Sequence, residues 1–138
     1  MLLGDGQVLA VGGQHEGGVP IGSAEVFDPA TGAWSETGAL DEPRDHHTTR
    51  LLADWNVLVA GGGRDRLAIT ELYDQDSGVW STSAHMIEAR SSHSATILPD
   101  GRDDCVEQPA HIDGQPFDEC YGLLSFFVGR EQYVGWYR

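Results

Sequence analysis

The sequence contains no lysine, and its eight basic residues are all arginine. Its 22 acidic residues give a formal net charge of −14 at pH 7. A surface with this charge repels phosphate groups, so nucleic acid and anionic lipid are excluded as expected partners, and basic protein patches are favoured. The sequence also lacks any run of 18 apolar residues, which excludes a membrane-spanning helix.

Cysteine is scarce, because only Cys105 and Cys120 occur, and two cysteines define no redox compartment. They enclose 14 residues, and a disulfide between them would restrain this segment by about 3 kcal/mol. Two free thiols are the alternative. The first residues, MLLGDGQVLAVGG, lack the basic start of a secretory signal. A chain of 138 residues that is 40% apolar is typical of one globular domain.

Internal repetition is the most informative feature of the sequence. VLAVGG at residues 8–13 returns as VLVAGG at 57–62, and EVFD at 25–28 returns as ELYD at 71–74. The displacement falls from 49 to 46 residues, so the first copy has three extra residues after its double glycine. The repeated positions are, in the first copy, Gly12, Gly13, Phe27, Asp28, Trp34, Arg44 and His47, and in the second, Gly61, Gly62, Tyr73, Asp74, Trp80, Arg90 and His93.

Each copy is typical of β structure. Short Val-rich runs end in glycines, which can take the positive φ of a sharp turn. An alternating strand follows, then a turn that begins with Asp28 or Asp74, and then a short strand with Trp34 or Trp80. A polar connection through Arg44 or Arg90 leads into the next strand. Four short strands in about fifty residues describe one blade of a β-propeller.

These residues resemble the kelch repeat family over roughly residues 1–102. The resemblance rests on the double glycine, the aromatic-Asp pair, the spaced Trp and the following Arg and His. It implies an all-β fold, an incomplete kelch-type propeller of four-stranded antiparallel blades. It also implies that the strands with His47 and His93 lie nearest the axis, and that the repeated aromatic residues pack between blades. Arginine as the only long basic side chain looks similar to bacterial proteins from GC-rich genomes.

The expected organisation is a partial blade at residues 1–45, a complete blade at 46–91, the start of a third at 92–102, and a non-repeat tail at 103–138. In the tail, the β-prone runs 123–128 and 132–137 are separated by three residues with a glycine, which predicts a hairpin. This hairpin could replace missing strands of the third blade. Alternatively, the gene ends abruptly and the tail is not a blade element.

Two blades and part of a third cannot close a ring, because propellers have about four to eight blades. Blades gain stability mainly from contacts with their neighbours, so uncovered blade faces are expected to be apolar interaction surfaces. The sequence therefore predicts either a piece of a larger propeller or self-association through exposed blade faces.

The sequence predicts no catalytic set, no metal site and no cofactor. His46, His47 and His93 could suggest a metal site, but His47 and His93 are repeat positions, and no local spacing supplies three ligands. The segment 74–78 faintly resembles a calcium loop, yet it lacks the terminal Glu and is interpreted as a turn.

The loops after the double glycines are the expected partner contacts, because strand packing does not require their polar residues. The residues concerned are Gln14, His15 and Glu16, and Arg64, Asp65 and Arg66. The leading hypothesis is a non-catalytic kelch-repeat binding module whose partner is a protein or a glycan.

Two alternatives remain open. One is a remnant of a kelch-propeller sugar enzyme, either epimerase-like or galactose-oxidase-like. The oxidase would need two Tyr and two His on copper, one Tyr cross-linked to Cys, and no such pattern is found: Tyr73 is a repeat aromatic and both cysteines lie outside the repeats. The other is a truncated product without independent function.

Overall fold

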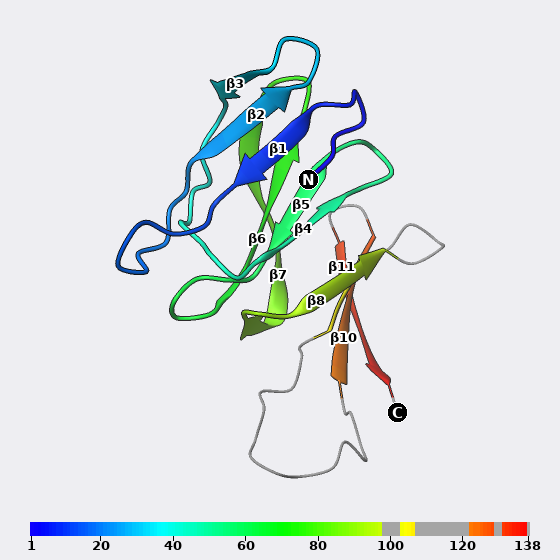
Figure 1. Cartoon of the computed structure of the whole chain (residues 1–138). Helices are drawn as coiled ribbons and strands as arrows, with labels where there is room; N and C mark the ends of the chain where they lie inside the picture. The colour runs from blue at the N-terminus through cyan, green and yellow to red at the C-terminus, as the bar shows by residue number, and fades with distance from the viewer. Residues whose placement is uncertain (98–102, 107–121, 129–130, 138) are drawn as a thin grey trace, which may run out of the picture.

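The computed structural model describes residues 1–97, 103–106, 122–128 and 131–137, with side chains for residues 1–96. These residues form three antiparallel sheets and contain no helix, so the described part of the chain has no helix that could span a membrane. The expectation of an all-β fold is confirmed. Each sheet joins strands that follow one another in the sequence, which is the connectivity of a propeller blade (Figure 1).

The first blade is a sheet in the order β1 (Val8–Val11), β2 (Ala24–Asp28) and β3 (Ala33–Glu36). The start of the chain runs beside β1, where Leu2 forms a β-bridge with Val8. This short segment occupies the place of an innermost strand.

The second blade has the order β4 (Thr48–Leu51), β5 (Val57–Ala60), β6 (Leu67–Asp74) and β7 (Val79–Arg90). The prediction of a short Trp strand followed by a polar connection is wrong for this blade, because β7 continues to Arg90. The physical reason is strand pairing: β6 begins at Leu67 and pairs with Arg90 across two register shifts. In the first blade β2 begins at Ala24, and the matching segments are joined by single backbone bonds such as that from the Arg44 N–H to the Ile21 carbonyl (3.1 Å).

In both blades a turn begins at the aspartate that ends the second-to-last strand, Asp28 on β2 and Asp74 on β6. The Asp74 carboxylate accepts hydrogen bonds from the backbone N–H groups of Ser77 (3.0 Å) and Asp76 (2.9 Å). These bonds, that of Ser77 first, hold the pKa of Asp74 below its ordinary value. Asp28 accepts a matching bond from the Ala30 N–H (2.8 Å). The segment 74–78 is therefore an aspartate-initiated turn, as predicted.

The third sheet has the order β8 (Ser94–Ile97), β9 (Asp103–Val106), β10 (Gly122–Val128) and β11 (Glu131–Tyr137). β10 and β11 pair in antiparallel register, which confirms the predicted hairpin. β9 pairs with both β8 and β10, so the sheet crosses the expected boundary at residue 102. The hairpin thus lies where a third blade would have its outer strands.

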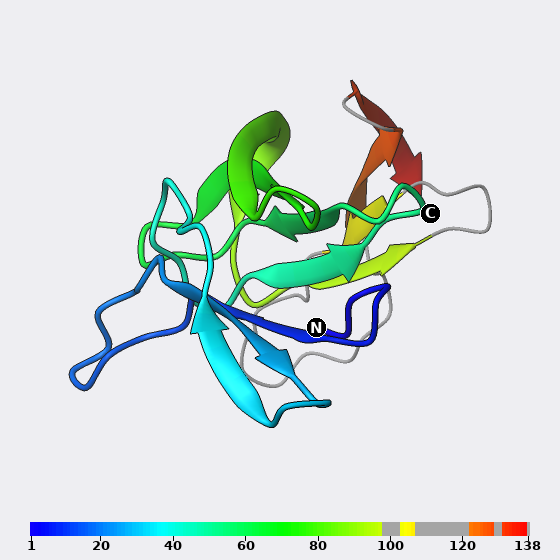
Figure 2. The same ribbon diagram turned by 90° about the horizontal axis from the view of Figure 1, so that it is seen from above.

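The three sheets are stacked side by side, and the second lies between the other two (Figures 1 and 2). β5 shows this in its burial, since all four of its residues are buried. Val57 and Val59 pack with Leu9 of the first blade, whereas Leu58 and Ala60 pack with Ala95 of β8. A strand covered on both faces needs a continuous apolar run, and VLVA is such a run.

The innermost strands of the second and third sheets are in contact. The Arg50 guanidinium on β4 donates to the Ala95 carbonyl on β8, with Nε at 2.9 Å and Nη2 also in contact. β4 and β8 follow His47 and His93, so the two strands in contact are those that the kelch resemblance implies to lie nearest the axis.

Candidate functional site

The joint between blades begins at the double glycines. Gly12 has φ +61° and Gly61 has φ +64°, a left-handed backbone that glycine adopts without strain. A Cβ on either residue would lie 2.5 Å from a carbonyl oxygen, that of Arg44 or of Arg90. The following glycines, Gly13 and Gly62, donate their N–H groups to the same two carbonyls at 2.8 Å. The double glycine therefore lets each blade approach the segment that leads into the next blade.

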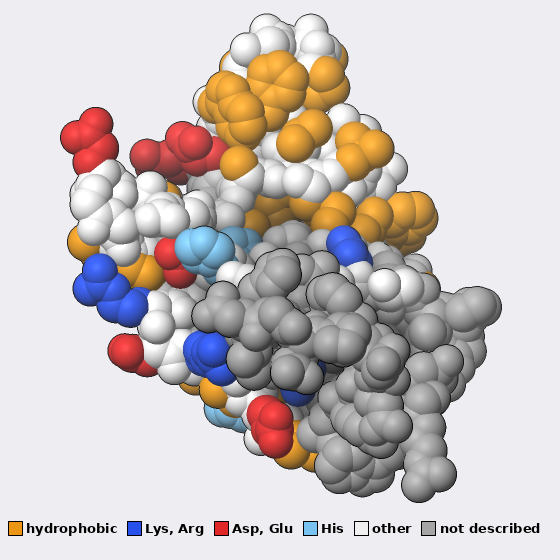
Figure 3. All heavy atoms as spheres, turned by 60° about the horizontal axis from the view of Figure 1, so that its bottom comes forward, with side chains coloured by type: hydrophobic (Ala, Val, Ile, Leu, Met, Phe, Trp, Pro, Cys, Tyr) orange, Lys and Arg blue, Asp and Glu red, His pale blue; other side chains and the backbone are white. Residues whose placement is uncertain are grey.

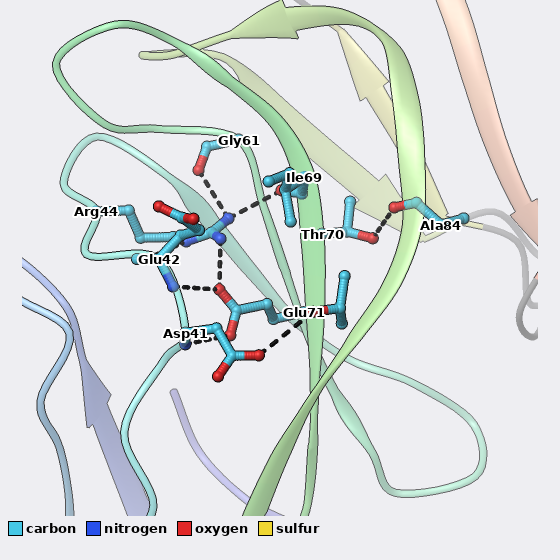
Figure 4. A network of polar contacts seen from close by, with 9 residues as sticks. Asp41, Glu42, Arg44, Gly61, Ile69, Thr70, Glu71 and Ala84 are labelled. Carbon is cyan, nitrogen blue, oxygen red and sulfur yellow. Dashed lines mark hydrogen bonds and ion pairs between the residues drawn. The ribbon is translucent and has the colours of Figure 1, made fainter.

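The segment between β3 and β4, residues 37–47, is called the linker below. Its Arg44 side chain is fully buried and forms an ion pair with Glu71 on β6, with Nη2 2.5 Å from Oε1 (Figure 4). Nη1 of the same guanidinium donates to the carbonyls of Gly61 (3.1 Å) and Ile69 (2.9 Å). Burial lowers the pKa of Arg44 below its ordinary value, and the neighbouring Glu71 opposes this effect only in part.

Glu71 also holds the linker backbone. Its carboxylate accepts the N–H of Asp41 (2.8 Å) and the N–H of Glu42 (3.2 Å). Figure 4 shows these groups converging from the linker onto β6. A buried ion pair is stable only if further hydrogen bonds satisfy both groups, and here they do. Its chemical role is to fix the linker of the first blade to the second blade.

Aromatic residues fix the outer part of the same joint. The Trp80 indole N–H donates to the Gly38 carbonyl (2.7 Å), and the Tyr73 hydroxyl lies 2.8 Å from the Thr37 hydroxyl. Both aromatic residues belong to the second blade, and both linker residues follow the first. The rings of Tyr73 and Trp80 pack with centroids 5.0 Å apart.

The two repeat histidines lie behind the glycines. A Cβ on Gly12 or Gly61 would lie within 2.9 Å of the Cε1 atom of His47 or His93, respectively. Burial, with a smaller effect of Arg44 or Arg90, lowers the pKa of both histidines to about 4. They are therefore neutral at pH 7. His93 Nε2 lies 3.0 Å from the Thr48 hydroxyl, whereas the Nδ1 atoms of both rings are buried without a hydrogen-bond partner.

His46 points elsewhere, since its ring is exposed and contacts the Asp45 carboxylate at 3.1 Å. Among residues 1–96, no three His, Cys, Asp or Glu side chains converge as metal ligands. Cys120 lies outside the described residues, so the disulfide with Cys105 stays a prediction.

The predicted partner loops are exposed at all six positions, namely Gln14, His15, Glu16, Arg64, Asp65 and Arg66. The start of each loop is hydrogen-bonded to the same linker. The Gly13 N–H donates to the Arg44 carbonyl, and the Gly63 N–H donates to the Asp45 carbonyl. They lie together at the lower left of Figure 1. Figure 3 brings this side forward and shows acidic, basic and histidine side chains interspersed there.

The sequence reasoning singled out Arg44 but missed its partner Glu71 and the linker amides that Glu71 accepts. A signal was present: Glu25 and Glu71 are matched acidic residues within otherwise apolar strands. A repeated acid and a repeated arginine indicate a repeated ion pair, because an unpaired charge is rarely buried.

Stacked antiparallel meanders of three and four strands, joined by double glycines and an arginine linker, have the architecture of β-propeller blades. Residues 1–38 match the family model of the Kelch motif. The match to the Kelch motif is thus shown for residues 1–38, and the described sheets have the fold of propeller blades.

The search of curated proteins found no match. Among solved structures, the chain is similar to a fungal alcohol oxidase of the AA5 family in complex with copper, with 16% identity and a TM-score of 0.68. The likeness covers 96% of this chain but 28% of the oxidase chain. This chain thus spans little more than a quarter of that propeller-containing protein's length. At this identity the likeness shows the fold.

Proposed function

We propose that this chain forms part of a larger kelch-type propeller and serves as a non-catalytic interaction module for a protein or glycan partner. One observation carries the proposal. Two buried charged residues of the described blades, Arg44 and Glu71, form an ion pair that joins one blade to the next. Exposed polar side chains stand beside that joint on the two loops that follow the double glycines, and also on the linker at Asp41, Glu42 and His46.

The chemistry of these loops suits a polar partner surface. His15 and Glu16 stand on one loop and Arg64, Asp65 and Arg66 on the other, so donors and acceptors of both signs are available. Such groups can bond the hydroxyls of a glycan or the polar groups of a peptide. The net charge of −14 favours a partner with a basic surface.

The alternative is a remnant of a copper oxidase, which the similar solved structure makes worth testing. Copper needs several converging His, Cys or carboxylate ligands. Within residues 1–96, the two repeat histidines, His47 and His93, each pack against a glycine at a blade joint, which does not favour their convergence on a metal ion.

The experiment uses the full chain. Binding to arrayed glycans and to basic peptides is measured for the natural chain and for a variant with His15, Glu16, Arg64 and Asp65 changed to Ser. Asp76→Asn, an exposed change in the turn before β7, is the control. The proposal predicts loss of binding in the loop variant alone, with metal-free protein. Stoichiometric copper with oxidase activity, or binding unchanged by the loop variant, would contradict it.

A further inference from the structure

The first blade presents an uncovered copy of the surface that the linker covers on the second blade. Trp34 is 53% exposed, whereas the matching Trp80 is 7% exposed. Glu25 is exposed, whereas the matching Glu71 is fully buried. The local structure does not differ, because the Phe27–Trp34 rings lie 5.1 Å apart at 43°, against 5.0 Å and 41° for Tyr73–Trp80.

What covers the second blade is known from its contacts. The linker brings the Gly38 carbonyl to the indole of Trp80, and the Arg44 guanidinium to Glu71. The first blade offers the same acceptor and donor, namely a carboxylate at Glu25 and an indole N–H at Trp34. The surface made by Glu25, Phe27, Trp34 and Glu36 is called the open face.

The open face also carries two neighbouring carboxylates, whose repulsion a guanidinium would reduce. Glu25 on β2 stands directly opposite Glu36 on β3, and opposed residues of antiparallel strands share one face. Like charges in this arrangement destabilise a sheet. In the second blade Thr82 stands opposite Glu71, so this cross-strand pair contains one carboxylate, and that carboxylate is neutralised by Arg44.

We propose that the open face binds a further kelch blade, whose linker places an arginine on Glu25 and a backbone carbonyl on the indole of Trp34. The inference rests on the proposal that this chain is part of a larger propeller, and it names the groups that meet at the junction. Phe27 has no hydroxyl, so the bond between Thr37 and Tyr73 has no counterpart at this junction.

A second copy of this chain is a poorer occupant. Its Arg44 is fully buried between its own blades, and its Arg90 is buried at 1% exposure. Neither of these two arginines is exposed on the surface of the described residues. A separate blade with its own arginine linker has the chemistry that the open face lacks.

The repeat itself supplies the test. Met1 follows the register of Arg50, displaced by 49 residues, so residues 1–49 can be placed before residues 1–138 without shifting the repeat. This extended chain adds one blade with the natural linker. Hydrogen exchange of β2 and β3 and the unfolding equilibrium constant are then measured with and without Glu25→Gln in the original copy. Glu88→Gln, at an exposed position of β7, is the matched control.

The proposal predicts that the added blade protects β2 and β3 from exchange. Glu25→Gln should raise the unfolding constant of the extended chain about 100-fold, because it leaves a buried arginine unpaired, but less than about twofold in the natural chain. Changing the added arginine to Gln should give a loss that is not additive with Glu25→Gln.

The other outcomes are informative in different ways. Protection of β2 and β3 with no effect of Glu25→Gln would overturn the arginine junction but leave the larger propeller standing. No protection at all would overturn both. A dimer of the natural chain that Trp34→Ala dissociates, measured by sedimentation, would show a second copy on the open face and overturn the proposal. Partner binding through the loops is measured separately and does not depend on these results.

Discussion

Trp34 and Trp80 occupy the same position in successive blades and pack on the same kind of neighbour, yet only Trp80 is covered by the linker of a preceding blade. Its indole donates to the Gly38 carbonyl at 2.7 Å. Trp34 is left 53% exposed. The difference separates what a kelch blade holds by itself from what its neighbour provides. The packing of the two aromatic rings occurs within one blade, whereas burial of the indole requires the linker of the preceding blade.

This difference predicts unequal costs for the same substitution. Trp80→Ala removes a buried ring and should lower the free energy of unfolding by about 3–5 kcal/mol. Trp34→Ala removes mainly the contact with Phe27, so it should cost about 1 kcal/mol. Urea denaturation of both variants measures this. Equal losses would mean that Trp34 is covered in solution.

The close approach at the double glycines gives a second prediction. Gly12→Ala and Gly61→Ala each place a Cβ 2.5 Å from a backbone carbonyl and at positive φ. Gly32→Ala has φ +70° but nothing within 4 Å of its Cβ, so it isolates the cost of the backbone conformation, about 1–2 kcal/mol. The first two variants should lose clearly more stability than this control in thermal unfolding. If all three lose the same amount, the blades are not in contact at the glycines.

The sequence predicted the blades well because their periodicity and turn residues are local signals. The double glycines, the aspartate turns and the order of strands follow from residues close together in the chain. The ion pair between Arg44 and Glu71 could not be derived in this way, because its partners belong to different strands and meet only when blades stack. The predicted aromatic strand was too short for β7, since its extension depends on pairing with the start of β6 at Leu67, which is distant in the sequence.

The pH dependence of stability provides a third prediction. Burial lowers the pKa of His47 and His93 to about 4 in the folded chain, against about 6.5 when unfolded. Below pH 6.5 the unfolded chain binds protons that the folded chain does not, so stability falls as the pH falls from about 6.5 to about 4. The loss should be about 1–2 kcal/mol per histidine at pH 5.

Urea denaturation across this window measures the effect. Changing His47 and His93 to Gln should flatten the dependence of the free energy of unfolding on pH. His15→Gln, in an exposed loop, should leave it unchanged. A dependence that persists in the double variant would place its origin in other groups and contradict the histidine account.

The third sheet could be predicted from the sequence only in part. The hairpin of β10 and β11 could be predicted from two β-prone runs and a glycine between them. Its attachment to β8 through β9 could not, because Asp103–Val106 has neither the apolar run nor the double glycine of the repeat. β9 pairs with an edge of β8, and this pairing depends on the folded sheet rather than on a sequence motif.

The most direct test of the account compares Glu71→Gln with Glu25→Gln in the natural chain by urea denaturation. Both remove a carboxylate at the same position of successive blades. If the joint depends on the linker, Glu71→Gln leaves Arg44 buried without its partner and costs about 3–5 kcal/mol, whereas Glu25→Gln changes stability by about 0.5 kcal/mol or less. Similar effects of the two substitutions would contradict the claim that the buried charges of this chain hold one blade to the next.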